Sequence, residues 1–522
     1  MTFDLIKEWK NRIPKHIWVC FITGVITGWL THFYMLTHKL PNWDEANNLS
    51  GYGSGDYLGR WFLKYIHPLG SSYSMPAVHG MLLIIFLALS ACLVLAILDL
   101  HTITAAVLAP MLMVTFPSVA CTMTFMFMAH TSGMAVFMIC LAIYLFRRYK
   151  WGWLSCSILL ICSLGVYQSY ISIAIALMLM CMIVDVLDGK DFATVVKRGI
   201  YCVIVLLVTV GIYMWLCHVF YPNIDNETYG GIGNMGNIAV SQMPRLIARC
   251  YKRFFEYFIW KPFDFMSKTM QCMNVVTCIL AVILGIYHII KGKMYHRPME
   301  CVLYCILCLF MPLAVAFVYF MAPDAPFSML MLYAYVLIYI TVIMLWERAI
   351  AYWQDGQEIK WKTIMRKLLV WITVLCIMIS CYCNYLISNT AYLRMEISYE
   401  RVTSYFNRII ERVESCEGFQ NGDKVAMLGE FYYLDNPSPT EIGGFYTEQL
   451  RSMDGVALEN GLITSGVRNN FIETFIGFDM ANLSETEKTE IMESQSYQQM
   501  PVYPAEGSIC KIGDVWIVKL CE

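Results

Sequence analysis

The sequence predicts a polytopic α-helical membrane protein with about eleven transmembrane helices, followed by a C-terminal α/β domain outside the membrane. Composition is the first observation: the 522 residues are 58% hydrophobic and their mean hydropathy is +0.55. Only 15% of them are charged, whereas soluble domains contain roughly 25%. The second observation is that long apolar runs recur along the chain, and the third is that Lys and Arg gather between alternate runs. An ordinary soluble globular enzyme is therefore excluded.

The predicted spans follow from length, because roughly 20 apolar residues cross the hydrocarbon core. The apolar run over 151–187 is divided at GVYQSY, since Gln168 would be costly at the bilayer centre. The eleven ranges are 17–36, 76–98, 102–120, 125–146, 151–167, 169–187, 199–220, 272–290, 299–321, 328–346 and 367–388.

The distribution of Lys and Arg predicts the orientation, because cytoplasmic loops carry an excess of these residues. With a cytoplasmic N-terminus, the basic clusters all fall on the cytoplasmic side: Lys7, Lys10, Arg12 and Lys15; Arg147, Arg148 and Lys150; Lys190, Lys197 and Arg198; Lys291, Lys293 and Arg297; Arg348, Lys360, Lys362, Arg366 and Lys367. The outer turns near 118–124, 168 and 322–327 carry none. An odd number of spans then places the C-terminus outside.

Two domains are expected: a transmembrane domain over 1–389, with outer loops at 37–75 and 221–271, and an extracytoplasmic soluble α/β domain over 390–522. In the second domain we expect an amphipathic helix over 391–414, a strand over 424–430, and a terminal hairpin over 509–520 that turns at Gly513. Ser484 and Glu487 form a capping-box pattern. The domain has three cysteines, an odd number, so a full disulfide framework is not expected, although a single bridge stays open.

The first outer loop contains the strongest candidate chemistry, in the stretch PNWDEANNLSGYGSGDYLGRWF (41–62). Asp44 or Glu45, in a pocket walled by Trp43 and Trp61, can act as a general base, because partial burial raises the pKa of a carboxylate toward the working pH. Arg60 offers a fork of donors to a phosphate oxygen. The alternative is that the acidic residues only solvate the loop while Arg60 reaches the membrane interface.

The second outer segment predicts a basic amphipathic helix with interleaved aromatic residues, PRLIARCYKRFFEYFIWKPF (244–263). Such a helix lies in the membrane interface, where Arg245, Arg249 and Arg253 could hold a lipid-linked phosphate by charge. The alternative is a simple interface anchor for a long loop.

Weaker candidates complete the predicted substrate pocket. Tyr167 and Gln168 could hydrogen-bond sugar hydroxyls, or they could simply face lipid headgroups. Asp324 could face the same cavity, although an Asp between two prolines is typical of a tight turn. His130 is interpreted as structural. There is no phosphate-binding loop, no dinucleotide fingerprint and no metal-ligand spacing, so no metal site is predicted.

The chain resembles the bacterial O-antigen glucosyltransferases of Gtr type two. The resemblance lies in the acidic pair after the first span, in the GRW that precedes the second span, in GVYQSYISIA (165–174), and in MPVYPAEGSICKIGDVWIVKL (500–520). It implies a GT-C type membrane glycosyltransferase of the bacterial cytoplasmic membrane. Such an enzyme moves a hexose, here glucose, from a polyprenyl-phosphate carrier to a cell-surface polysaccharide or glycolipid on the outer face, with inversion.

The resemblance also implies residue roles and partners. Asp44 would be the catalytic base, with Glu45 as alternative or helper, and Arg60 would lie near the donor phosphate. A second acidic residue, which many such enzymes carry in the second outer loop, is absent from 118–133, so a two-carboxylate or metal-bridged scheme has no support. We expect no cofactor besides the lipid-linked donor; a divalent metal fits the chemistry but no residue pattern indicates one. A donor synthase and a donor flippase would be functional partners, and nucleic acid would not.

Three other functions remain open. A polytopic transporter usually shows internal repeats and charged residues at the membrane midplane, and this sequence has few charges inside its spans. A polysaccharide polymerase or ligase would carry arginines in a large outer loop, as at 245–253, but not the acidic pair after the first span. A non-catalytic glycan-binding membrane protein would not depend on Asp44.

Overall fold

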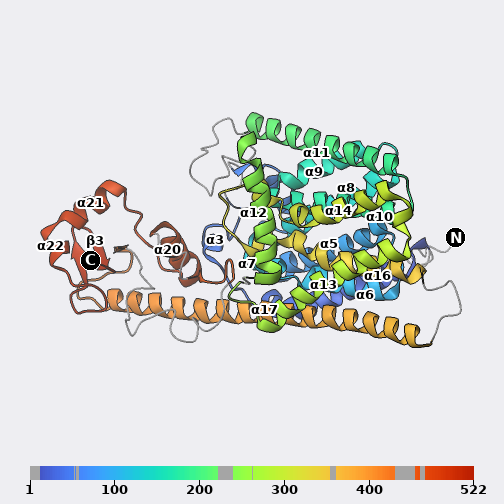
Figure 1. Cartoon of the computed structure of the whole chain (residues 1–522). Helices are drawn as coiled ribbons and strands as arrows, with labels where there is room; N and C mark the ends of the chain where they lie inside the picture. The colour runs from blue at the N-terminus through green and yellow to red at the C-terminus, as the bar shows by residue number, and fades with distance from the viewer. Residues whose placement is uncertain are drawn as a thin grey trace, which may run out of the picture.

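The computed structural model describes residues 12–51, 53, 58–220, 239–260, 263–352, 360–429, 453–458, 462 and 465–521. A bundle of long helices makes up most of the molecule, and a smaller part formed by the C-terminal residues lies beyond one end of it (Figure 1). Helix α17 runs along the bundle and continues into the smaller part (Figure 1).

Within the described residues, nine helices are long and apolar enough to cross a membrane. They are built on α2 (Lys15–Thr37), α5 (Pro76–Leu98), α8 (Ala129–Arg148), α10 (Ile171–Leu187), α11 (Phe192–Phe220), α13 (Lys268–Lys291), α14 (Pro298–Val315), α16 (Val336–Ala351) and α17 (Lys360–Glu414). The prediction of a polytopic helical membrane protein is confirmed at this level.

Two of the eleven predicted spans are not among these nine helices. The range 102–120 forms α6 (Ile103–Thr115) and α7 (Pro117–Thr124), which meet at an angle of 41°. The bend falls at Pro117, which lacks the N–H of a continuing helix. Helix α9 (Gly152–Leu164) has only 13 residues and is followed by the 3₁₀ turn η4 (Gln168–Tyr170) before α10 begins. The chain therefore breaks where GVYQSY was expected to divide the run.

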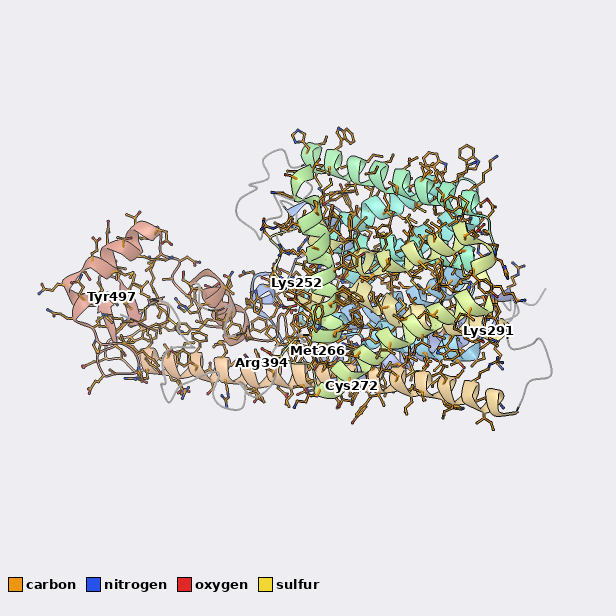
Figure 2. The ribbon with its side chains drawn as sticks, viewed as in Figure 1. Lys252, Met266, Cys272, Lys291, Arg394 and Tyr497 are labelled. Atoms are coloured by element: carbon orange, nitrogen blue, oxygen red, sulfur yellow. The ribbon has the colours of Figure 1, made fainter. Side chains whose placement is uncertain are left out.

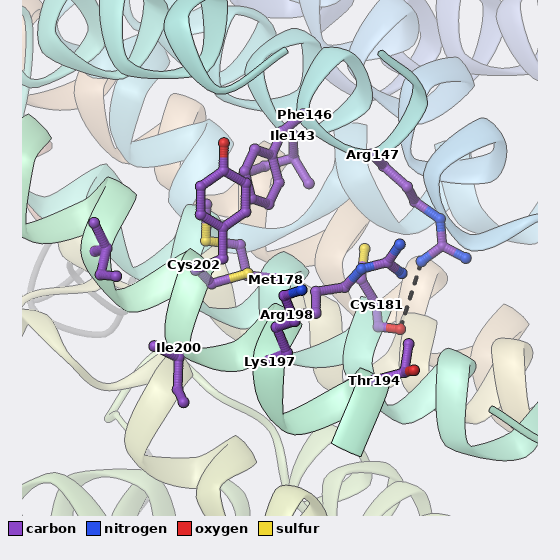
Figure 3. A pocket seen from close by; sticks show the side chains of 12 residues that line it. Ile143, Phe146, Arg147, Met178, Cys181, Thr194, Lys197, Arg198, Ile200 and Cys202 are labelled. Atoms are coloured by element: carbon purple, nitrogen blue, oxygen red, sulfur yellow. Dashed lines mark hydrogen bonds between the residues drawn. The ribbon is translucent and has the colours of Figure 1, made fainter. Parts of the chain in front are cut away.

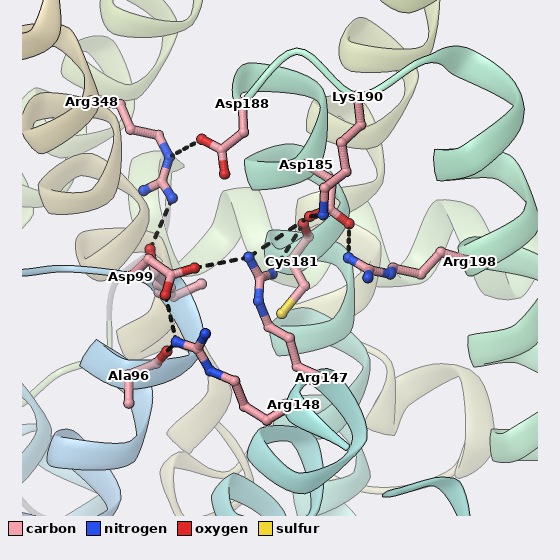
Figure 4. A network of polar contacts seen from close by, with 11 residues as sticks. Ala96, Asp99, Arg147, Arg148, Cys181, Asp185, Asp188, Lys190, Arg198 and Arg348 are labelled. Carbon is pink, nitrogen blue, oxygen red and sulfur yellow. Dashed lines mark hydrogen bonds and ion pairs between the residues drawn. The ribbon is translucent and has the colours of Figure 1, made fainter. Parts of the chain in front are cut away.

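One end of the bundle, here called the basic end, contains the clusters that were predicted to share a side. Asp99 at the end of α5 pairs with Arg147 and Arg148 at the end of α8. Asp188, just after α10, pairs with Arg348 of α16 (Figure 4). The Lys and Arg clusters of separate loops are thus neighbours in space, as the charge distribution predicts.

The opposite end, here called the loop end, gathers short elements from the predicted outer segments. These are α3 (Trp43–Asn47), α4 (Leu63–Ile66), η2 (His67–Leu69), η3 (Met126–Met128), η6 (Val240–Gln242), α12 (Met243–Phe255), the π-helix η7 (Glu256–Trp260), α15 (Val318–Met321), η9 (Met329–Met331) and η10 (Tyr333–Tyr335). The smaller C-terminal part lies beyond this end (Figure 1).

The C-terminal part contains a three-stranded sheet in the order β1 (Lys424–Leu428), β3 (Val515–Lys519), β2 (Ile509–Ile512). Strands β2 and β3 are antiparallel and form the expected hairpin, in which Gly513 takes a positive φ of 61°. Strand β1 joins β3 in parallel. Around the sheet lie α20 (Ser465–Phe471), the π-helix η11 (Ile472–Ile476), α21 (Glu485–Glu493) and α22 (Gln495–Gln499). The capping box of Ser484 and Glu487 at the start of α21 is confirmed.

Helix α17 differs from the prediction in its continuity, because it is one helix of 55 residues. The separate helix expected over 391–414 is its second half, and position 389/390 lies inside it. No Pro or Gly interrupts the chain between the apolar and amphipathic halves, so the helix simply continues. Val402, Ile409 and Val413, which belong to the predicted apolar face, are fully buried against the C-terminal part.

Candidate functional site

The acidic pair after the first span lies on α3, a short helix at the loop end. The side chain of Asn42 caps α3 by accepting a hydrogen bond from the backbone N–H of Glu45, at 3.1 Å. The ring of Trp43 is half-buried and meets Phe125 edge to face at 6.2 Å between ring centres. This cap and this contact fix α3 against the helices below it.

The contacts of Glu45 indicate a structural role. Its side chain is completely buried and forms an ion pair with Lys39 and a hydrogen bond from the Ser74 hydroxyl. The Lys39 ammonium also donates to the Ser74 carbonyl at 3.1 Å. Burial raises the pKa of Glu45, while Lys39 and Ser74 act in the opposite direction. These contacts join α3 to the chain just before α5, and they leave Glu45 no face toward solvent.

Asp44 has a different environment, although it is the adjacent residue. It is half-buried, and within the described part of the chain its carboxylate forms no hydrogen bond and no ion pair. Burial raises the pKa of Asp44, and the positive charge of Arg60 opposes the shift. Asp44 is therefore a half-buried carboxylate with no ion-pair partner in the described part of the chain.

Arg60 is oriented by Tyr167. Its guanidinium carbon lies 5.0 Å from the centre of the Tyr167 ring, in cation–π geometry. Its Nε is buried and has no hydrogen-bond partner among the described residues. A half-buried guanidinium with an unused donor can bind an anion (phosphate or carboxylate) of a substrate.

Gln168, one of the candidate sugar ligands, holds the first outer loop. Its Nε2 donates to the Leu58 carbonyl and lies 2.9 Å from the Tyr213 hydroxyl, which donates to the Gly59 carbonyl at 3.0 Å. Gly59 has a φ of +76°, and a Cβ there would lie 2.6 Å from the Tyr213 hydroxyl oxygen. Only glycine fits this close approach.

Trp61, the second expected wall of the pocket, packs into an apolar cluster with Tyr213 and Cys217. Only 8% of it is exposed, and its ring stacks with Phe220 at 5.6 Å between ring centres. Together with Gln168 it anchors the segment that carries Arg60.

The predicted basic amphipathic helix is present as α12, and its apolar residues Leu246, Cys250 and Phe254 are buried. Arg253 pairs with Glu256 at 2.9 Å, and its guanidinium carbon lies 4.7 Å from the centre of the Phe327 ring. Arg249 is half-buried and donates to the Ala325 carbonyl at 3.4 Å. These two arginines join α12 to the 322–330 segment.

The remaining residues predicted for this segment are more peripheral. Arg245 is exposed on α12, and Asp324 is exposed on a turn in which the N–H of Ala325 bonds to the Ala322 carbonyl. Neither forms an ion pair with a described residue. Positions 221–238 and 261–262 of the second outer segment lie outside the described residues.

Asp454 is a residue that the sequence did not indicate. Its carboxylate accepts hydrogen bonds from the Ser328 hydroxyl at 2.7 Å and from the Leu330 N–H at 3.1 Å. Its carbonyl accepts one from the Thr124 hydroxyl at 3.1 Å. The segment 453–458 (MDGVAL) thus lies among the elements of the loop end.

Three buried histidines lie below the first outer loop. The rings of His79 and His130 are 4.2 Å apart between centres, and His67 lies 5.5 Å from His130. His130 Nε2 is 3.0 Å from the His67 carbonyl oxygen, consistent with the structural role expected for it. Within the described residues, no group of His, Cys, Asp or Glu is arranged to hold a metal ion, and no disulfide is present.

Comparison with known proteins adds one finding. A family described as Glucosyl transferase GtrII matches residues 33–346, more than half of the 522-residue chain. The match includes α3, Arg60, Tyr167 and α12, and it ends before α17 and Asp454. No curated protein and no solved structure matches the chain.

Proposed function

Because the chain belongs to the GtrII glucosyl transferase family, we propose that it moves glucose from a polyprenyl-phosphate carrier to a cell-surface polysaccharide or glycolipid, at the outer face of the membrane and with inversion. The family indicates glycosyl transfer, and the long apolar helices indicate a membrane protein. The lipid-linked donor, the stereochemistry and the residue roles are the proposal.

The observation that carries the proposal is a half-buried carboxylate, Asp44, in the same loop as the Arg60 guanidinium, whose positive charge lowers the pKa of Asp44. Asp44 is partly desolvated and its carboxylate has no partner among the described residues. Burial raises its pKa, and the positive charge of Arg60 lowers it. A general base needs a pKa raised toward the working pH and an open approach to the proton it accepts. Asp44 meets both requirements, whereas Glu45 is enclosed by Lys39 and Ser74.

The proposed step is a single displacement. An acceptor hydroxyl oxygen attacks C1 of the glucose and transfers its proton to Asp44 while the bond from C1 to the phosphate oxygen breaks. The polyprenyl phosphate leaves with the bond electrons. Attack opposite the leaving group inverts the anomeric carbon, and it requires one base without a covalent sugar intermediate.

The leaving phosphate needs positive charge, which side chains can provide. Arg60 has an unused buried donor and lies in the same loop as Asp44. Arg253 and Arg249 lie on α12, whose amphipathic character suits the membrane interface where a lipid carrier presents its headgroup. We assign Arg60 to the departing phosphate and the α12 arginines to donor capture.

The C-terminal part is proposed to act on the acceptor side. It lies beyond the loop end, and Asn470 of α20 donates to the side chain of Asn47 on α3 at 2.6 Å. A glycan approaching Asp44 from outside the membrane would therefore pass along this part. We take 390–522 as its working limits, although α17 is continuous across position 389.

The test is a donor comparison with the purified full chain in detergent. Radiolabelled glucose is offered either as polyprenyl-phosphate glucose or as a nucleotide sugar, with the same acceptor glycan. The proposal expects label transfer from the lipid-linked donor alone and an inverted linkage by NMR. Transfer from the nucleotide sugar, or retention of configuration, would overturn the donor or the mechanism.

A further inference from the structure

A cavity of about 460 Å³ opens on the side of the bundle near the basic end, between α8, α10 and α11. Apolar side chains form most of its wall: Ile143, Phe146, Met178, Ile200, Tyr201, Cys202 and Ile204. Arg147, Lys197, Arg198 and Thr194 line the end nearest the helix termini (Figure 3). The cavity thus joins an apolar body to a cationic end.

The charges at this end are unbalanced. Asp185 is buried and faces three cations, namely Arg147, Lys190 and Arg198, while Asp99 faces Arg147 and Arg148 (Figure 4). Lys197 is exposed and lines the cavity, but no described carboxylate pairs with it. Two further described carboxylates lie in the same loop region: Asp191 is exposed and bonded to Thr194, and Asp188 pairs with Arg348. Six cations therefore face four carboxylates, which leaves a net positive charge.

Helix α11 makes the cavity accessible from the bilayer. Its exposed apolar residues include Ile200, Val203, Ile204, Leu207 and Trp215, and a membrane helix with such a surface faces lipid. A second cavity of about 250 Å³ borders α11 together with α10 and α14, and apolar side chains such as Leu206 and Phe310 line it without any cation. The two cavities therefore have similar apolar walls, and they differ mainly in that only the first has cationic side chains at one end.

We propose that the cavity between α8, α10 and α11 binds one anionic phospholipid from the leaflet at the basic end. The distribution of Lys and Arg predicts that this leaflet is the cytoplasmic one. The phosphate contacts Lys197 and the outer edge of the Arg147–Arg198 network, and an acyl chain occupies the apolar body between α8 and α11. Basic pockets between transmembrane helices suit such headgroups. This lipid site lies at the opposite end of the bundle from Asp44 and is independent of the proposed transfer reaction.

The test is native mass spectrometry of the full chain in detergent with phosphatidylglycerol, phosphatidylcholine or glycerol 3-phosphate added. The proposal expects phosphatidylglycerol to bind at lower concentrations than phosphatidylcholine. Lys197→Glu should weaken phosphatidylglycerol binding by about five-fold or more, since each basic residue near a membrane surface contributes about that factor. Lys197 is exposed, so the variant should fold.

Two further variants test whether the lipid binds in the cavity itself. Lys291→Glu makes the same charge change at the same end but outside the cavity, and it should leave binding unchanged (Figure 2). Ile204→Trp places a larger side chain in the apolar body and should reduce phosphatidylglycerol binding without a charge change. Equal binding of the two lipids, equal losses in the two Lys variants, or complete competition by glycerol 3-phosphate would overturn the lipid site.

Discussion

The guanidinium carbon of Arg60 lies 5.0 Å from the ring centre of Tyr167, so a residue of the first outer loop rests on a residue of the α9–α10 junction. The positive charge of the same guanidinium lowers the pKa of Asp44. A cation–π contact of this kind contributes roughly 0.5–2 kcal/mol and fixes the plane of the guanidinium. This contact therefore orients the proposed phosphate ligand, whose charge also influences the proposed base.

Replacing Arg60 by Lys is expected to raise the donor KM by about tenfold, because Lys keeps the charge but loses the planar fork and the stacking on Tyr167. Steady-state kinetics with lipid-linked glucose measure the effect. Tyr167→Phe keeps the ring and should stay near wild type, whereas Tyr167→Leu should shift KM in the direction of Arg60→Lys. A donor KM that does not change in Arg60→Lys would remove Arg60 from the donor site.

The pH profile should report Asp44. Burial raises its pKa above that of an ordinary aspartate, so kcat/KM should fall as pH decreases through this raised value, where the base becomes protonated. Arg60 lowers the pKa of Asp44 by its charge, and Arg60→Gln should therefore move the acidic limb to higher pH. A limb that stays in place, or moves to lower pH, would contradict the electrostatic coupling.

Donor capture should depend on one face of α12. Arg253→Gln is expected to raise the donor KM several-fold, because Arg253 lies against Phe327 and faces the loop end. Lys252→Gln is the matched control: Lys252 is the adjacent residue, and its side chain is 70% exposed (Figure 2). Equal effects in the two variants would indicate a general loss of interfacial charge rather than a donor site.

Docking of the segment 453–458 should depend on Gly455. Its φ is +83°, and a Cβ would lie 2.1 Å from the Thr124 hydroxyl oxygen, so Gly455→Ala should displace the segment. Hydrogen exchange should then increase over 453–458 and 117–124. Gly466→Ala in α20 is the control, since nothing lies within 4 Å of its Cβ position. Unchanged exchange in Gly455→Ala would contradict the docking.

Asp454→Asn tests the other anchor of this segment. It weakens the hydrogen bonds from Ser328 and Leu330 to a charged acceptor, at a cost of roughly 1–3 kcal/mol. Faster hydrogen exchange over 322–332 is expected, together with a rise in KM for donor or acceptor. Exchange and KM equal to wild type would show that Asp454 does not support the site.

Local patterns allowed much of the fold to be predicted. Apolar length located the helices, GVYQSY marked the break before α10, and Gly513 marked the hairpin of β2 and β3. Residues near in sequence determine each of these features, through burial, backbone freedom and turn chemistry. The bend at Pro117 could have been read from the same rules, although the sequence interpretation treated 102–120 as one span.

The parts that were missed depend on long-range contacts. Asp454 meets Thr124 across 330 positions, and no local pattern predicts such a pair. The contacts of the Gln168 amide nitrogen with the Leu58 carbonyl and the Tyr213 hydroxyl could not be predicted either, because these partners are 110 and 45 positions away. Asp44 and Glu45 are adjacent and chemically alike, and only the positions of Lys39 and Ser74 distinguish them.

The rate of glucosyl transfer by Asp44→Asn, at saturating lipid-linked glucose, tests the proposed catalytic role most directly. Glu45→Gln serves as the control, because its side chain is enclosed by Lys39 and Ser74 and its loss should affect thermal stability more than turnover. We expect Asp44→Asn to lose about 10²- to 10⁴-fold in kcat, the range that a general base contributes, and Glu45→Gln to stay within about tenfold of wild type. Turnover of Asp44→Asn at the wild-type rate would contradict the role of Asp44 as the catalytic base.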